Sequence, residues 1–344
     1  MAVTMHPRYV SKSDFPTPLF NALGLRAIGS KTISIKPDKW GIKEPPKGAV
    51  PTDEIFVAGT RDQILRLETS VNSLAPDTTT GDDLSHIETI AFQSPEAKLK
   101  NIAKVESWLE VVLHNHSNVN VLSAFARYAD ELGARVDVKR SRKVGGLTFV
   151  PVSATGAVSQ QIARFSFLRV ARSMPTLRPM RPPLIRSVKQ KATLPVDDAI
   201  SADFRALIFD GGIPPSVLPT LGRWVNLITP SGIGLSHPEL ESHGLAVTSA
   251  FLFGTIDSSN QLKRPLCSVD HVRVLDRALF SSTDPYYFDV LDRIVQYFDA
   301  EGDNYDLINL SIGPNVPFDD GDVTLWTSSL DERLASGQWV VTVA

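Results

Sequence analysis

From Phe204 to the end of the sequence, short apolar segments alternate with longer ones whose apolar residues recur at helical spacing. Strands are predicted for FRALIFD, WVNLITP, SVDHVRVLD, YDLINLSIG and QWVVTVA. Helices are predicted for the segments HGLAVTSAFLFG, YYFDVLDRIVQYFDAEG and VTLWTSSLDERLASG. The first strand lacks the polar–apolar alternation of a half-exposed strand, so we expect it to be covered on both faces. This order of elements predicts an α/β fold with a doubly wound parallel sheet.

Residues 106–174 have a different order of elements. Strands are expected at SWLEVVLHN, ARVDVKR, LTFVPV and FLRVARSM, and helices at NVLSAFARYADELG and TGAVSQQIARFS. Gly133 is placed to end the first of these helices. The resulting βαββαβ order is typical of an α+β ferredoxin-like domain.

The remaining sequence is less regular. In residues 1–100, KTISIKP and EIFVAG indicate strands, RDQILRLETSVNSL a helix and PDTTTGDD an exposed turn, so we expect an α+β or partly ordered extension. Residues 177–202 are rich in proline and basic side chains, which favours a solvated linker, with a docking surface as the alternative. The predicted organisation is thus an extension (1–100), a ferredoxin-like domain (104–176), a linker (177–202) and an α/β domain (203–344).

Composition limits the classes of partner. Of 344 residues, 42% are hydrophobic and 21% charged, and the net charge is −3, so the total charge does not favour nucleic acid or an anionic membrane as a partner. No apolar run reaches the roughly 18 residues of a membrane span. The single cysteine, Cys267, excludes an internal disulfide framework and suits a reducing compartment. We therefore expect a cytoplasmic protein that binds neither nucleic acid nor membrane.

Two polar residues and one short segment stand at places where chemistry is expected. Functional groups of a doubly wound sheet collect at the carboxyl ends of its strands. Asp210 ends an apolar strand and is followed by Gly211 and Gly212, which allow a sharp turn. His243 precedes the predicted helix HGLAVTSAFLFG, where the helix N-terminus favours a neutral imidazole. Taken singly, Asp210 is better explained as a turn residue and His243 as a structural or exposed histidine.

The third feature, NLSIG at residues 309–313, follows an apolar strand and exposes backbone groups to an extended peptide. In combination, strand–Asp–Gly–Gly, His–Gly–small–x–Val and Asn–Leu–Ser–x–Gly, with 33 residues from Asp210 to His243, resemble the subtilisin-like serine peptidases (subtilases). The resemblance implies that Asp210 orients the imidazole of His243. It also implies that His243 acts as the general base toward a serine, and that Ser311, Ile312 and Gly313 pair with the substrate backbone. RALFSS, residues 277–282, would be the opposite substrate-binding strand.

The βαββαβ block is in turn similar to subtilase propeptides. In that family the propeptide assists folding and lays its C-terminal tail through the active-site cleft. Here Ser173, Met174, Pro175 and Thr176 would begin that tail. With no secretion signal at its start, the chain resembles intracellular bacterial subtilases, some of which are encoded beside an AAA-type ATPase. We therefore expect a protein or peptide substrate and an ATPase of that type as a partner.

The resemblance ends at VVTVA, before the family's oxyanion-hole Asn and nucleophilic Ser. We expect the sequence to be a fragment or truncated product of a serine endopeptidase, inactive in this form. Two alternatives stay open: a catalytically inactive module that binds peptides or inhibits a peptidase, and a different doubly wound enzyme, which would place Asp210 and His243 far apart. No cofactor and no metal are expected. His114 and His116 are interpreted as surface histidines, and the aspartates at 319, 320 and 322 as a charged loop before a helix.

Overall fold

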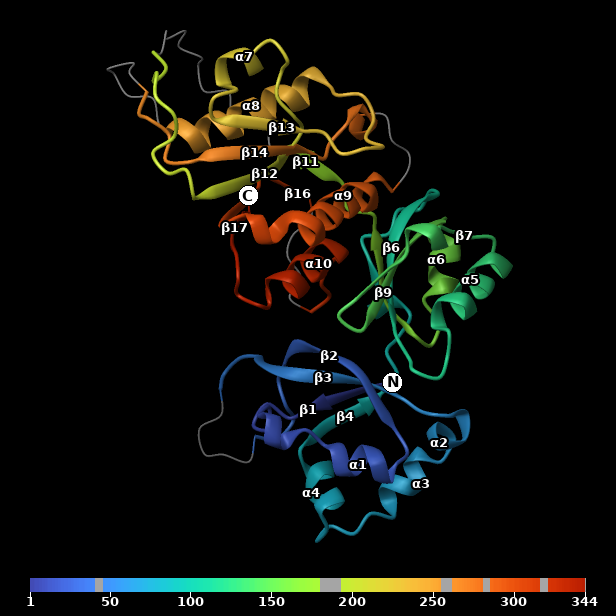
Figure 1. Cartoon of the computed structure of the whole chain (residues 1–344). Coiled ribbons are helices and arrows are strands. Elements are labelled where there is room, and N and C mark those ends of the chain that lie inside the picture. Colours follow the sequence, from blue (N-terminus) through green and yellow to red (C-terminus); the bar gives the residue numbers. More distant parts are fainter. Residues whose placement is uncertain (41–45, 180–192, 255–261, 281–284, 316–320, 344) are drawn as a thin grey trace. The chain divides into compact units, whose positions relative to one another are not determined.

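In the computed structural model, residues 1–40, 46–179, 193–254, 262–280, 285–315 and 321–343 can be described (Figure 1). They form two compact units. Unit 1 contains residues 1–173 together with 318–325, and unit 2 contains residues 174–317 together with 326–344. The chain therefore passes from one unit to the other at Ser173 and Met174, three residues before the predicted domain end at residue 176.

The first sheet of unit 1 is antiparallel, with strand order β2-β3-β1-β4. Its strands are β1 (Ala2–Met5), β2 (Arg26–Ile35), β3 (Val50–Ala58) and β4 (Ile87–Ala91). The helices of this part are η1 (Lys12–Asp14), α1 (Thr17–Ala22), α2 (Arg61–Leu65), α3 (Leu67–Asn72) and α4 (Thr79–Ser85). Residues 1–100 are thus an ordered α+β layer over most of their length. Their core is built around Val3, Leu19, Phe20 and Ile55.

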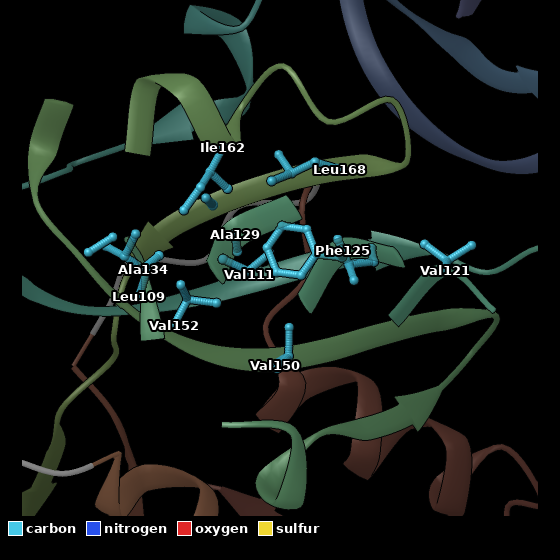
Figure 2. Packing of buried hydrophobic residues seen from close by; sticks show 13 residues of the cluster. Leu109, Val111, Val121, Phe125, Ala129, Ala134, Val150, Val152, Ile162 and Leu168 are labelled. Carbon is cyan, nitrogen blue, oxygen red and sulfur yellow. The ribbon is translucent and has the colours of Figure 1, made fainter. Parts of the chain in front are cut away.

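The second sheet of unit 1 contains the predicted βαββαβ order with two further strands, and only the first part of ARVDVKR is a strand. Its strands are β5 (Leu99–Lys100), β6 (Ser107–His114), β7 (Arg135–Val136), β8 (Arg142–Val144), β9 (Leu147–Ala154) and β10 (Leu168–Ser173), in the order β5-β10-β6-β9-β7 with β8 beside β9. The helical segments are η2 (Glu96–Lys98), α5 (Val121–Glu131), η3 (Val138–Arg140) and α6 (Gly156–Ile162). Apolar residues of α5 and α6 pack against one face of the sheet, with Phe125 and Ile162 fully buried (Figure 2).

Segment 321–325 follows unit 2 in the sequence but packs within unit 1. Asp322 is 3% exposed, and its carboxylate lies 3.3 Å from Nε of Arg169 and 3.7 Å from Nζ of Lys31. Arg172 donates hydrogen bonds to the carbonyl oxygens of Asp322 and Val323. Asp322 thus lies in a loop before α10 (Leu325–Leu334), as predicted, and is buried among basic side chains of unit 1 that neutralise it, whereas Asp319 and Asp320 lie outside the described residues.

Unit 2 is built on a five-stranded parallel sheet with order β13-β14-β12-β15-β17. The strands are β12 (Arg205–Asp210), β13 (Val225–Ile228), β14 (Ser268–Arg273), β15 (Leu307–Leu310) and β17 (Val340–Val343). The helical segments are α7 (Leu218–Leu221), α8 (Pro238–Phe253), η4 (Arg277–Phe280), α9 (Tyr286–Glu301), η5 (Gly302–Asn304) and α10 (Leu325–Leu334). The chain is thus a mixed α/β protein that combines antiparallel sheets with a parallel one.

Strand β12 lies at the centre of the parallel sheet and is covered on both faces, as its unbroken apolar sequence predicts. Ile208 belongs to a buried cluster that includes Leu252 of α8, and the ring of Phe209 packs edge-on against Tyr297 of α9 at a centroid distance of 5.8 Å. Both residues are fully buried. None of the helices in the described ranges combines the length and apolarity that a membrane crossing requires.

Several local predictions were wrong. The segment RDQILRLETSVNSL forms two short helices, α2 and α3, that are separated at Arg66. PDTTTGDD is largely the helix α4 rather than an exposed turn, because Thr78 caps it and Asp83 turns inward to accept a hydrogen bond from the amide of Leu19. His114 is buried against Phe56 rather than on the surface.

The proline-rich linker predicted for 177–202 begins with a strand instead. Leu177–Pro179 form β11, which pairs antiparallel with β16 (Ile312–Pro314). Residues 180–192, which include most of the predicted basic run, lie outside the described residues.

Candidate active site

Asp210 is the last residue of the central strand β12 and is completely buried. Its Oδ1 accepts a hydrogen bond of 2.6 Å from the amide of Gly211. Gly212 then adopts a φ of +103°, a conformation that residues with a side chain rarely adopt, and the chain turns out of the sheet. The backbone at the end of the strand therefore helps to orient the carboxylate of Asp210.

His243 lies in the second turn of α8 and is 8% exposed. The prediction that it precedes the helix is wrong. The helix begins at Pro238, whose fixed φ suits the first helical position, and the side chain of His237 caps it by accepting from the amide of Glu239. The helix N-terminus therefore does not hold His243 neutral, because the dipole effect falls off within the first turn.

The structure brings Asp210 and His243 together. Nδ1 of His243 lies 2.8 Å from Oδ1 of Asp210, within a buried environment. An ionised carboxylate only accepts hydrogen bonds, so this contact assigns the proton of the neutral imidazole to Nδ1. The lone pair is then on Nε2, the nitrogen that can take a proton from another group. The large separation of the two residues, expected for a different doubly wound enzyme, is not observed.

Close packing of backbone on backbone makes this contact possible. A Cβ atom added at Gly211 would lie 2.6 Å from Cβ of Leu240, one turn of α8 before His243, and one added at Gly244 would clash with the carbonyl oxygen of Gly212. Side chains at either position would force the helix away from the turn. The two glycines thus set the separation of the elements that carry Asp210 and His243.

Ser311, Ile312 and Gly313 follow the carboxyl end of β15, the strand next to β12. The hydroxyl of Ser311 donates to Oδ1 of Asn309, whose amide donates in turn to Thr342 on β17. Ile312 is buried. Residues 312–314 form the short strand β16, whose backbone pairs with β11.

The pairing of β11 with β16 is in register over three residue pairs. Leu177 faces Pro314, Arg178 faces Gly313, and Pro179 faces Ile312. The amide of Asn315 adds a hydrogen bond of 2.7 Å to the carbonyl oxygen of Thr176. Leu177 is 8% exposed, whereas the side chain of Thr176 is exposed. An extended segment of the chain therefore occupies the edge that was predicted to bind an extended peptide.

The described part of RALFSS, residues 277–280, is not the opposite substrate-binding strand that was predicted. Residues 277–280 form the short 3₁₀ helix η4, and residues 281–284 lie outside the described ranges. The chain is held just before η4 by Asp276, which accepts hydrogen bonds from the amides of Gly234 and Ala278 and lies 3.0 Å from the guanidinium of Arg293.

One buried residue beside the pair was not singled out from the sequence. His271, in the middle of β14, is fully buried and bonded both to the turn after Asp210 and to α8. The signal available was a histidine within an otherwise apolar strand flanked by Val269 and Val272. Among the described residues, no group of three or more His, Cys, Asp or Glu side chains is arranged to hold a metal ion.

Neither a protein-family model nor a curated protein matches this chain.

Proposed function

We propose that unit 2 carries the acid and the base of a subtilisin-like serine endopeptidase. The observation that carries the proposal is the contact of 2.8 Å between the buried carboxylate of Asp210 and Nδ1 of His243, at the carboxyl edge of a parallel sheet. A carboxylate that orients an imidazole in this way leaves Nε2 directed to accept a proton from a nucleophile. The chain order, with Asp before His, is the one that subtilisin uses.

The strand order of unit 2 argues against a dinucleotide-binding enzyme. Numbered along the chain, the parallel sheet has the order 2-3-1-4-5. Dinucleotide-binding and flavodoxin-like sheets have the orders 3-2-1-4-5-6 and 2-1-3-4-5. The glycines after β12 are used here for the contact with α8, and no Gly-x-Gly-x-x-Gly motif follows that strand.

In the proposed reaction, His243 removes the proton of a serine hydroxyl as the serine attacks the peptide carbonyl. Asp210 stabilises the imidazolium that forms, and His243 then gives the proton to the leaving amine. Water hydrolyses the acyl-enzyme with the same base. The family places the serine, and the Asn that stabilises the oxyanion, after the strand that corresponds to β17. The proposal requires both groups in the active enzyme, and an oxyanion donor contributes about 3 kcal/mol of transition-state stabilisation.

The pairing of β11 with β16 supports the same proposal. In subtilases, the propeptide tail lies in the substrate cleft, and here the segment that follows the ferredoxin-like block pairs with residues 312–314. We propose that β16 is a substrate-binding strand and that β11 occupies it as a substrate-like segment. Backbone hydrogen bonds of this kind supply affinity without requiring a particular side chain.

The β11–β16 pairing also favours a second candidate function, a peptide-binding module without catalysis. The strand edge and the extended segment that pairs with it are both present among the described residues. Such a module would bind extended peptides at β16 and would not modify them.

A serine-directed fluorophosphonate probe, applied to the gene product translated to its own stop codon, separates the two functions. The peptidase predicts covalent labelling that is lost in the variants His243→Ala and Asp210→Ala and kept in Ser242→Ala, an exposed position of the same helix. Absence of labelling in the wild-type protein, together with binding of an extended peptide, would contradict the peptidase and favour the module.

A further inference from the structure

His271 connects the two elements that carry the candidate acid and base. It is fully buried in β14, the strand beside β12. The amide of Gly212, two residues after Asp210, donates a hydrogen bond of 3.1 Å to Nε2 of His271. Nδ1 of the same ring lies 2.9 Å from the hydroxyl oxygen of Thr248, five residues after His243 on α8. A single imidazole thus touches both the turn and the helix.

The hydrogen bonds fix the protonation of this ring. The amide of Gly212 can only donate, so Nε2 of His271 must be the acceptor, and the neutral ring carries its proton on Nδ1. Nδ1 then donates to the hydroxyl of Thr248. Burial, together with a smaller effect of nearby His243, lowers the pKa of His271 to about 4, although the Asp210 carboxylate opposes the shift. The ring is therefore neutral at physiological pH, as the contact with Gly212 requires.

The position of the ring explains why both contacts matter for the pair. A Cβ atom added at Gly244, the residue after His243, would lie 2.9 Å from Cε1 of His271 as well as clashing with Gly212. The ring of His271 therefore packs against Gly244. One ring nitrogen bonds to the turn, and the other bonds to the helix. A shift of α8 along the sheet would break the bond to Thr248, and a shift of the turn would break the bond to Gly212.

We propose that His271 is a positioning residue that holds the turn after Asp210 and the helix of His243 in register, so that the Asp210–His243 hydrogen bond forms before substrate arrives. This inference rests on the proposed function of the pair, and it adds a role for a residue outside it. His271 takes no part in proton transfer, because its two nitrogens are engaged with Gly212 and Thr248. Preorganisation of this kind is what a supporting layer of hydrogen bonds contributes to a catalytic site.

The test uses the 344-residue chain and the ring-nitrogen NMR shifts of His243, which report which nitrogen carries the proton. In the wild-type chain we expect the Nδ1–H form that the contact with Asp210 requires. Two substitutions break these contacts, the first removing one bond and the second removing both. Thr248→Val keeps the shape of the side chain and loses the hydroxyl, and His271→Leu leaves the amide of Gly212 without its acceptor. In both variants, the fraction of His243 that carries its proton on Nδ1 should fall below the wild-type value.

One matched variant keeps both bonds. Thr248→Ser retains the hydroxyl and should keep the wild-type spectrum of His243. Ile294→Val, in the core contributed by α9, lowers stability without touching these contacts and should also leave the spectrum unchanged.

The outcomes separate the two claims. A wild-type chain whose His243 lacks the Nδ1–H form contradicts the proposed function, and the inference fails with it. A wild-type chain that shows the form, with Thr248→Val and His271→Leu indistinguishable from it, overturns the role of His271 alone.

Discussion

Gly244, the residue after His243 on α8, packs directly on the carbonyl oxygen of Gly212 in the turn that follows β12. No side chain fits between the helix and the turn at this point. The hydrogen bond between Asp210 and His243 therefore depends on this close contact between the backbone of α8 and the turn.

The substitution Gly244→Ala tests this contact. Alanine favours the helical conformation by about 1 kcal/mol over glycine, but its Cβ would clash with Gly212. Overpacking of this kind costs about 1–3 kcal/mol, so we expect a net loss of stability and a weakened contact between Asp210 and His243. Denaturant unfolding of unit 2 and the His243 NMR spectrum measure the two effects. Ser242→Ala, exposed on the same helix, should change neither, and a Gly244→Ala chain as stable as wild type would contradict the packing argument.

The substitution Leu177→Ser tests whether β11 blocks a peptide-binding edge. Leu177 is buried, and a buried leucine side chain contributes about 1.5–3 kcal/mol relative to an exposed one. We expect the β11–β16 pairing to open more often, which would speed hydrogen exchange at Ile312 and Gly313. Binding of a labelled peptide with the sequence MPTLRP should rise at the same time. Thr176→Ser, at the neighbouring exposed position, serves as the control. Faster exchange without added peptide binding would argue against a peptide site at β16.

Because of Glu110, we expect the free energy of unfolding of unit 1 to depend on pH. This residue is completely buried beside Arg172, at 3.2 Å, and burial raises the pKa of its carboxyl group to about 7, although Arg172 opposes the shift. The folded form then holds this proton more tightly than the unfolded form. Its contribution to stability is complete below the unfolded pKa near 4.5 and is lost as the pH rises through about 7.

In Glu110→Gln this contribution disappears. The stability of the variant relative to wild type should therefore increase between pH 4.5 and pH 8, by up to about 3 kcal/mol. Denaturant unfolding across a pH series, followed through hydrogen exchange of the β6 amides, measures the difference. Glu131→Gln, exposed on α5, should track wild type throughout. A constant difference between Glu110→Gln and wild type over this pH range would rule out the buried protonated carboxyl.

Cys267 reports on opening of unit 2. Its side chain is 2% exposed beside Trp224 and Val269, and burial raises the pKa of the thiol, with a further increase from Asp306. A thiol reagent reacts with the exposed thiolate, so we expect a rate at least about 1,000-fold below that of the unfolded chain, as a stability above about 5 kcal/mol implies. The rate should rise with denaturant in parallel with unfolding of unit 2. Rapid labelling of the native chain would contradict the buried position.

The sequence predicted the parallel sheet and the βαββαβ block because both have strong periodicity. The contact between Asp210 and His243 also followed from motif order, since strand ends and helices of a doubly wound sheet meet at one edge. The start of α8 was missed because its capping residue is a histidine, His237, which is not among the preferred caps.

Other features depend on long-range contacts that no local pattern contains. The inward turn of Asp83 requires an amide donor from residue 19, and the buried Asp322 requires basic side chains from distant strands. His271 is of the same kind, because its two partners lie 59 and 23 residues away. The strand β11 was hidden by its proline, which is tolerated on the edge that it occupies.

The strand β11 and its partner β16 belong to one polypeptide, so their pairing is independent of protein concentration. A separate peptide must compete with β11, which is covalently linked to β16 and has an effective concentration on the order of millimolar. Ligands of moderate affinity would be outcompeted at any dilution of the intact chain. Binding of a separate peptide to β16 therefore depends less on the peptide concentration than on the chain that connects β11 to β16. Cleavage or rearrangement of that chain would have the larger effect.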